Sequence, residues 1–365
     1  MSHALLDDEH RDRLRLIRSA NIGPVTYHQL IARFGTATRA LAAIPDLATR
    51  GGGKPPAIAG EGEVAREITR VDALGARYLF AGEALYPPAL REIDNAPPVL
   101  IVRGRLSLLE RPTVAIVGAR NASAAACRFA RGLAHDLAAE GCLVVSGLAR
   151  GIDTAAHQGS IEQATAGVIA SGIDVVFPPE NKDLQEQVAT QGVLIAEQPP
   201  GTQPLARHFP YRNRIFAAMG IGTVVVEAAP RSGSLITARL ANEAGREVMA
   251  VPGSPADPRA QGCNSLIRDG ATLIQNAADV MDAIRPIAAG VRAAGSRWTG
   301  APAEHRDPEG AERDRVVGLL GYVPVGVDEI VRQSGSSTSA VAMILLELEL
   351  AGRLERHAGG RVSLG

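Results

Sequence analysis

Short apolar runs alternate with helical stretches through the middle of this chain, and this alternation restricts its fold more than any other feature. The apolar runs span residues 113–120, 142–147, 166–171, 193–197, 222–228 and 247–253. Stretches with helical character, such as 123–141, 182–191 and 212–220, separate them. Because the runs are apolar on consecutive positions, both faces of the sheet that they form must be covered. The pattern therefore predicts an α/β fold, with a parallel sheet between two layers of helices over residues 78–286.

The first 77 residues have a different character and are expected to form a helical domain. Leu14, Ile17, Leu30 and Phe34 recur at helical spacing, and Gly23-Pro24 interrupts them. Two helices joined in this way resemble a helix-hairpin-helix or SAM-like module, whose hairpin can offer backbone amides to a phosphate. The hairpin lacks a second glycine, so a plain helical cap is the favoured alternative.

The C-terminal part of the chain contains a linker and a further small domain. Residues 287–310 are rich in Ala, Gly and Pro without periodicity, which predicts a linker. Residues 311–365 contain three helical stretches and a terminal hairpin, the outline of a winged helix. Its expected recognition helix, 338–350, has no Lys or Arg and two Glu, so a structural or protein-binding role is favoured over reading of a DNA groove.

Composition excludes several classes of protein. The formal net charge is −1, so any binding of an anion must be local. Cys127, Cys142 and Cys263 form no CxxC pair, which favours free thiols in a reducing compartment over a disulfide framework. The charged N-terminus has no apolar signal core, and no apolar run reaches the length of a membrane span. We therefore expect a soluble, cytoplasmic protein.

One segment lacks acidic residues altogether. No Asp or Glu occurs between Glu197 and Glu227, and the run LARHFPYRNRIF (205–216) combines three arginines with Phe209 and Tyr211. Arginine binds phosphates through a bidentate fork, and an aromatic face stacks on any base. The alternative is that the aromatic side chains belong to the core and the arginines to an ordinary surface.

Polar and glycine residues follow the expected strands. Gly118 and Arg120 come after the first central strand, and Ser146 and Gly147 come after the next. In an open parallel sheet, ligands bind beyond the carboxyl ends of the strands. Glycine allows a phosphate to approach the backbone, and the helix that follows supplies free amides. We therefore expect an anion site at these turns.

Known catalytic patterns are missing from the same turns. The first reads GARNAS instead of GxGxxG, and the second strand ends in Ser146 where a dinucleotide fold has an acid. There is no P-loop, no cluster with metal-ligand spacing and no GxSxG to accompany His157 or His208. Asp153 is expected to cap a helix, and a structural role is favoured for Glu227. No enzymatic activity, metal or cofactor is expected.

Seven motifs in order resemble the DNA-processing protein A family, also called DprA or Smf. They are VAIVGAR (114–120), SGLARGID (146–153), FPYRNRIFA (209–217), VVVEA (224–228), SGSLITA (232–238), AVPG (250–253) and GCNSLIRDGA (262–271). The resemblance implies an extended Rossmann-like domain with a helical domain before it and a winged helix after it. It also implies a homodimer that binds single-stranded DNA and loads the RecA recombinase in natural transformation.

The resemblance also implies a set of site residues. Arg120 would hold a phosphate at the glycine turn, Phe209 would stack on a base, and the later arginines would follow the DNA backbone. Tyr211 replaces a common lysine and adds a stacking surface, whereas Phe177 replaces a tyrosine expected to act in packing. The implied DNA-binding residues are Gly118, Arg120, Ser146, Gly147, Phe209, Arg212, Asn213 and Arg214.

The competing hypothesis is enzymatic. The run from Gly222 to Thr237 is also similar to the LOG-type nucleotide phosphoribohydrolases, in which a glutamate and an arginine act on the glycosidic bond. This chain lacks the PGG that precedes the motif in those enzymes, and Glu227 lies four residues after Thr223 instead of three. The hydrolase is therefore the alternative, and DNA binding is favoured.

Overall fold

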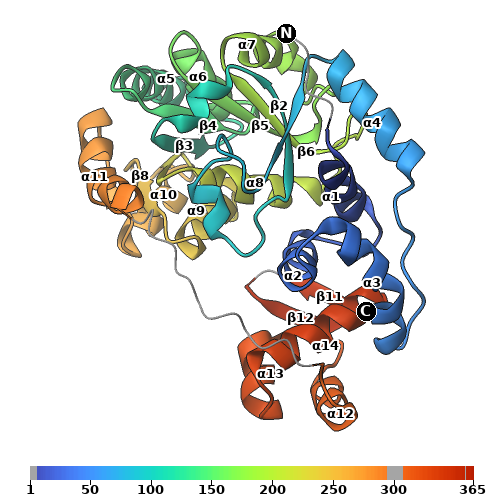
Figure 1. Ribbon diagram of the computed structural model, residues 1–365. Helices are drawn as coiled ribbons and strands as arrows, with labels where there is room; N and C mark the ends of the chain where they lie inside the picture. The colour runs from blue at the N-terminus through green and yellow to red at the C-terminus, as the bar shows by residue number, and fades with distance from the viewer. Residues whose placement is uncertain (1–5, 294–306, 358) are drawn as a thin grey trace. The chain divides into compact units, whose positions relative to one another are not determined.

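The computed structural model describes residues 6–293, 307–357 and 359–365, and the chain divides into two compact units. The central unit is the described part of Glu67–Arg297, and the terminal unit joins residues up to Arg66 with the described part of Trp298–Gly365 (Figure 1). The strands of the central unit are β1 (Arg77–Phe80), β2 (Val99–Gly104), β3 (Thr113–Gly118), β4 (Leu143–Ser146), β5 (Thr165–Gly172), β6 (Val193–Gln198), β7 (Gly222–Val226), β8 (Glu247–Ala250) and β9 (Thr272–Leu273).

In the described residues these strands form one nine-stranded sheet, in the order β1-β2-β6-β5-β4-β3-β7-β8-β9. The strands from β6 to β9 in that order pair in parallel, which confirms the α/β prediction for all six apolar runs. β1 and β2 were not predicted from the sequence, and β2 joins β6 in antiparallel register. Both strands are isolated by turns and short 3-10 helices, so they leave no alternating helix pattern in the sequence.

Helices cover both faces of the sheet (Figure 1), and the strands supply a separate core to each face. Val114 and Ile116 of β3 point to one face, where they pack with α5 (Ala124–Ala139) and α6 (Ile152–Ser160). Ala115 and Val117 point to the other face, where α8 (His208–Met219) lies. This alternation follows from the two-residue period of a strand. The remaining helices of the unit are α7 (Lys182–Gln191), α9 (Gly233–Glu243), α10 (Gln261–Arg268) and α11 (Ala277–Ala293).

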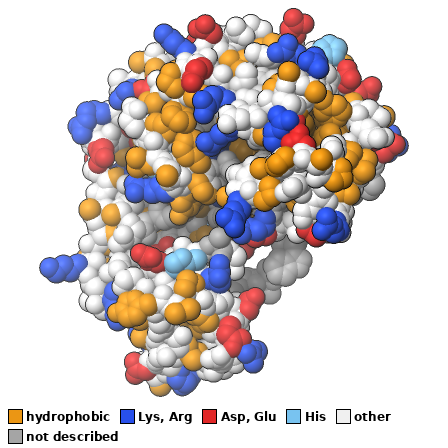
Figure 2. All heavy atoms as spheres, turned by 180° about the vertical axis from the view of Figure 1, so that it is seen from behind, with side chains coloured by type: hydrophobic (Ala, Val, Ile, Leu, Met, Phe, Trp, Pro, Cys, Tyr) orange, Lys and Arg blue, Asp and Glu red, His pale blue; other side chains and the backbone are white. Residues whose placement is uncertain are grey.

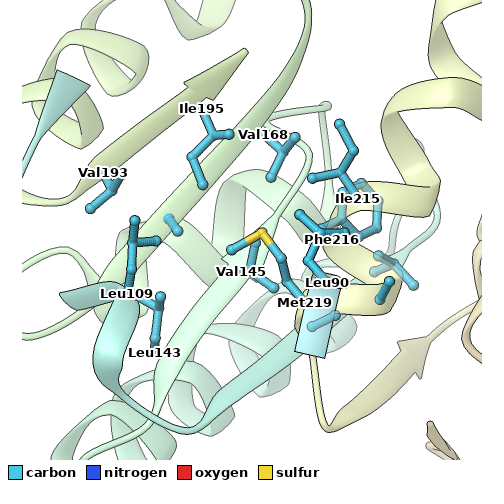
Figure 3. Packing of buried hydrophobic residues seen from close by; sticks show 14 of the residues in the cluster. Leu90, Leu109, Leu143, Val145, Val168, Val193, Ile195, Ile215, Phe216 and Met219 are labelled. Carbon is cyan, nitrogen blue, oxygen red and sulfur yellow. The ribbon is translucent and has the colours of Figure 1, made fainter. Parts of the chain in front are cut away.

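The position of α8 depends on its apolar residues. Ile215, Phe216 and Met219 lie beside strand residues that include Val145 and Val168 (Figure 3), and all five are buried. Burial of such side chains stabilises the fold by about 1.5–3 kcal/mol each. The C-terminal half of α8 is thus fixed to the sheet, and this fixes the polar residues of its first half at the carboxyl ends of the strands.

The terminal unit combines the two ends of the chain. Its helices are α1 (Asp8–Arg18), α2 (Pro24–Phe34), α3 (Ala37–Arg50), α12 (Gly310–Gly318), α13 (Val327–Ser334) and α14 (Thr338–Leu350), and α4 (Glu61–Ala73) begins in it. β10 (Val325–Gly326), β11 (Leu354–His357) and β12 (Arg361–Leu364) form the small sheet of the winged helix. α1 ends at Arg18, and α2 begins at Pro24 with Gly23 as its N-cap, so the chain breaks between two helices at this point, as predicted.

Helix α14 is buried along most of its length. Met343 and Leu346 share one core with Ile44 and Leu47 of α3. Glu347, one of the two glutamates of this helix, is itself buried and accepts hydrogen bonds from Arg313, with the closer nitrogen at 2.6 Å. The helix that would read a DNA groove is therefore occupied by intramolecular packing, which agrees with the structural role predicted for it.

The linker predicted from residue 287 begins later than expected, because helix α11 extends into it. α11 continues to Ala293, so residues 287–293 are helical, and 294–306 lie outside the described residues. The helix continues because its first part is anchored in the core by Val280 and Ile284, and a run rich in alanine propagates it. None of the helices in the described ranges is long and apolar enough to cross a membrane.

The central unit should lose stability in acid because of His157. This histidine of α6 is fully buried, its Nδ1 lies 2.8 Å from the hydroxyl of Thr165, and burial lowers its pKa from 6.5 to about 3. The unfolded chain therefore takes up a proton between pH 6.5 and 3 that the folded chain does not. Lowering the pH from 7 to 4.5 should cost about 3 kcal/mol of unfolding free energy through this residue.

Urea unfolding of wild type and His157→Asn at both pH values tests this expectation. The variant should lose much less stability over the range, whatever its stability at neutral pH. His135→Asn is the control, because His135 is exposed and should keep the wild-type pH dependence. Equal pH dependence in wild type and His157→Asn would contradict the assignment.

Candidate functional site

A pocket of about 230 Å³ opens where β3, β4 and β5 end. The loops after these strands form one wall, and the first turns of α8 form another. This is the edge at which parallel sheets bind ligands, and at which the sequence placed the anion site. The lining residues are Arg120, Gly147, Ala149, Arg150, Ile169, Ala170, Ser171, Phe177, Pro178, Pro179, Glu180, Pro204, Phe209 and Arg212.

Two phenylalanines form an aromatic surface in the pocket. The ring centroids of Phe177 and Phe209 lie 5.6 Å apart at an interplanar angle of 57°. The guanidinium of Arg120 lies 5.7 Å from the Phe209 centroid, and Arg120 is exposed. Phe177 was expected only to pack, yet 43% of its surface remains exposed. An exposed Phe177 and a half-buried Phe209 beside an exposed cation can stack on a planar base and bind an anion next to it.

Arg212 also lines the pocket, but it is anchored in the protein. Its Nη1 donates to the carbonyl oxygens of Gly147 and, at 2.6 Å, Val168. Its guanidinium carbon lies 5.9 Å from the ring of Phe209 and 5.3 Å from that of Phe216. Burial lowers the pKa of Arg212 to about 10, so the group still carries its charge at neutral pH. Arg212 therefore joins α8 to the loop after β4 and to the middle of β5, and it packs against the ring of Phe209.

Asp153 lies behind the same loop and supports it. Its carboxylate accepts the backbone N–H groups of Gly147 at 3.2 Å and Ala149 at 3.3 Å. Burial raises the pKa of this carboxyl, and the charge of Arg212 acts in the opposite direction. The prediction that Asp153 caps a helix is wrong, because Gly151 is the N-cap of α6 and Asp153 lies inside its first turn. The Asp153 side chain instead points back to the loop after β4, where it accepts the two backbone N–H groups.

Close packing behind the pocket explains the residue types of Gly118, Gly147 and Ser146. A β-carbon on Gly118 would overlap the backbone oxygen of Val226, and one on Gly147 would overlap the guanidinium of Arg212. The Ser146 hydroxyl is buried and donates to the carbonyl of Ile116 at 2.7 Å. The structure therefore gives these residues a part in close packing, and Ser146 does not face the pocket as the resemblance implied.

Arg214 differs from its expected position. The sequence suggested that residues 212–214 open a helix, but α8 begins at His208 because Pro210 is tolerated in a first turn. Arg214 consequently lies in the second turn, buried, with its Nη2 2.5 Å from Glu197 Oε1. The acid at the border of the acid-free segment thus neutralises one of its arginines. Asn213, half-buried, lies on α8 outside the described lining of the pocket.

Tyr211 does not extend the aromatic surface. It is two residues from Phe209 on a helix, which places the two side chains about 200° apart around the axis. Tyr211 is 55% exposed and lies outside the described lining of the pocket. The stacking surface expected for Tyr211 is therefore turned away from the site, and Phe177 occupies the corresponding place beside Phe209.

Glu227 makes the structural contacts that the sequence analysis favoured. Its two carboxylate oxygens accept hydrogen bonds from the hydroxyl and the backbone N–H of Ser123, at 2.6 and 2.8 Å. Ser123 is in turn the N-cap of α5. Glu227 thereby fixes the end of β7 to the start of this helix. Among the described residues, no group of three or more His, Cys, Asp or Glu side chains is arranged to hold a metal ion.

Comparison with known proteins agrees with this architecture. Residues 77–285 match the family described as DNA recombination-mediator protein A, 7–69 match the DprA-like N-terminal HHH domain, and 300–360 match the DprA winged helix domain. DNA processing protein DprA of Streptococcus pneumoniae is 44% identical over 54% of this chain and 70% of its own length. Protein Smf of Synechocystis is 33% identical over 78% of this chain and 79% of its own.

Two solved structures are also similar. The X-ray structure of the S. pneumoniae protein has a TM-score of 0.58 at 39% identity, covering 61% of this chain and 77% of that one. DNA processing protein A from Helicobacter pylori, whose structure is described for its single-stranded DNA binding mode, has a TM-score of 0.52 at 27% identity and covers 59% of this chain and 97% of its own. By these matches, the chain belongs to the DNA-processing protein A (DprA/Smf) family of DNA recombination mediators.

Proposed function

We propose that this protein binds single-stranded DNA in the pocket at the ends of β3, β4 and β5, acts as a homodimer, and loads the strand onto the RecA recombinase in natural transformation. The observation that carries the proposal is the Phe177–Phe209 pair beside Arg120. The H. pylori relative, described as a single-stranded DNA-binding protein, supports the same class of ligand. The family match to a recombination mediator supports transfer of the strand to a recombinase.

The chemistry of the pocket favours unpaired strands over duplex. A base can stack on Phe177 or Phe209 only when it has left its own stack, which a single strand allows at little cost. Arg120 and Arg150, both exposed, offer charge to the phosphates on either side. Arg212, Asp153 and Gly147 act as positioning residues, because their contacts fix the loop and the helix that carry the binding groups.

A binding function is also favoured over the hydrolase alternative. The glutamate that such an enzyme would direct at a glycosidic bond corresponds to Glu227, and both oxygens of Glu227 are hydrogen bonded to Ser123. Glu227 is absent from the described lining of the pocket. We therefore infer that DNA bound in this pocket is held and not cleaved.

Arg120→Ala should weaken the binding of an oligo-dT strand roughly tenfold, which is about 1.4 kcal/mol. Loss of one phosphate contact should also make the slope of log affinity against log salt shallower by about 0.7. Fluorescence anisotropy at several salt concentrations measures both. Arg128→Ala is the control, because Arg128 is exposed on α5 outside the described pocket lining, and it should change neither value. Wild-type affinity in Arg120→Ala at low salt would contradict the proposed site.

Phe209→Ala should weaken oligo-dT binding by about 1–3 kcal/mol if its ring stacks on a base. Tyr211→Ala removes a comparable ring from the opposite side of α8 and should have little effect. Melting temperatures are measured alongside, because Phe209 is half-buried and also packs on Phe177. If Phe209→Ala lost stability but kept its affinity below the melting temperature, the stacking role would be excluded.

Arg214→Leu should destabilise the protein and leave DNA affinity unchanged. The substitution leaves Glu197 without its partner in a largely buried position, which should cost about 3 kcal/mol of unfolding free energy. Adding Glu197→Leu removes the unpaired charge and should restore part of the loss. Urea unfolding and anisotropy of both variants test this. If the folded Arg214→Leu variant bound DNA more weakly than wild type, Arg214 would contact DNA and the purely structural role would be wrong.

A further inference from the structure

One acidic side chain lies in the pocket among its arginines. Glu180 is the one carboxylate that the described residues contribute to the lining, which also contains Arg120, Arg150 and Arg212. Its Oε1 lies 3.9 Å from Nη1 of Arg150, and both side chains are more than half exposed. A carboxylate beside an exposed arginine occupies the place that a phosphate would take, because both anions bind the same guanidinium edge.

The position of Glu180 is set by the fold. It belongs to the 3-10 helix η3 (Pro179–Asn181), and the next residue, Asn181, is buried. The Asn181 side-chain amide donates to the carbonyl of Leu148 at 2.9 Å and to the hydroxyl of Thr154 at 3.0 Å. These bonds join the segment after β5 to the loop after β4 and to the first turn of α6. They hold the backbone of Glu180 beside the loop that ends in Arg150.

Arg120, Arg150 and Arg212 consequently differ in how readily their charge can attract a ligand. Arg212 is buried against two carbonyls, with Asp153 behind it. Arg120 is exposed and lies over Phe209. Glu180 offsets the charge of Arg150. A phosphate that binds at Arg120 gains a new attraction, whereas one that binds at Arg150 must first displace a carboxylate.

We propose that Glu180 is an internal competitor for the phosphate that Arg150 binds. The inference rests on the single-stranded DNA binding proposed above and assigns this residue a role in setting its strength. An isolated phosphate or mononucleotide gains little by exchanging one anion for another at Arg150. A strand already held at Arg120 and the aromatic pair presents its next phosphate at high local concentration and displaces the carboxylate. Glu180 thus favours strands over single nucleotides.

Glu180→Gln tests the inference in the full chain. The substitution keeps the shape of an exposed side chain and removes its charge. Affinity for labelled oligo-dT should rise about two- to fivefold, corresponding to about 0.4–1 kcal/mol for an exposed ion pair. Competition by dTMP should strengthen as well, because a single phosphate no longer has to displace a carboxylate. Asp183→Asn is the matched control, since Asp183 is exposed on the adjacent helix α7 outside the described lining.

Asp183→Asn separates the loss of the Glu180–Arg150 ion pair from the effect of removing any one negative charge. Arg150→Ala completes a double-mutant cycle with Glu180→Gln. In the Arg150→Ala background, Glu180→Gln should give no gain beyond that of Asp183→Asn. The competitor role would be overturned if Glu180→Gln raised the affinity for oligo-dT no more than Asp183→Asn does, or if its gain persisted in the Arg150→Ala background. Either result would leave the proposed function intact. If neither wild type nor Glu180→Gln bound the oligonucleotide at low salt, both the inference and the function on which it rests would fail.

Discussion

The guanidinium of Arg212 is the contact on which the site depends. It reaches from α8 to the carbonyls of Gly147 and Val168, so one side chain joins the loop after β4 and the middle of β5 to the helix that carries Phe209. An unpaired arginine would be costly to bury, and here the backbone oxygens, two aromatic rings and the nearby Asp153 compensate for the lost water. Rigid placement of this kind lets exposed groups around it bind a flexible strand without first ordering themselves. In the proposed DNA site, we therefore expect Arg212 beneath the pocket to matter as much as the exposed arginines at its rim.

The protein has no extended surface of one charge on the face that Figure 2 shows. Basic, acidic and hydrophobic side chains are interspersed on the face seen in Figure 2, in keeping with a net charge of −1. Affinity for a polyanion must then come from a few well-placed arginines and from stacking, since no general positive field attracts it. We therefore expect the proposed site to respond strongly to single substitutions, including the loss of the single carboxylate among its arginines.

Much of this architecture could be predicted from the sequence, and the failures have physical causes. Continuous apolar runs identify parallel strands reliably, because both faces of such strands must be buried. The loops after β3 and β4 were identified as a site because the carboxyl ends of parallel strands share one edge. Side-chain direction was not predictable. A helix start four residues earlier than expected moved Arg214 to a buried ion pair and turned Tyr211 away from Phe209, and the antiparallel β2 left no helical pattern to reveal it.

The packing of α3 against α14 has a consequence for how the chain is made. Arg353 donates to the carbonyl of Gly51 across 302 residues of sequence, and a β-carbon at Gly51 would overlap the backbone of Glu347. Helices α1, α2 and α3 therefore lack part of their core until α14 has been synthesised. Domains usually fold in the order of synthesis, but the core around α1, α2 and α3 includes side chains of α14, which is synthesised after the central unit. Until then, Ile44 and Leu47 lack the contacts that Met343 and Leu346 of α14 supply, so we expect the packing of the N-terminal helices to be completed late in synthesis.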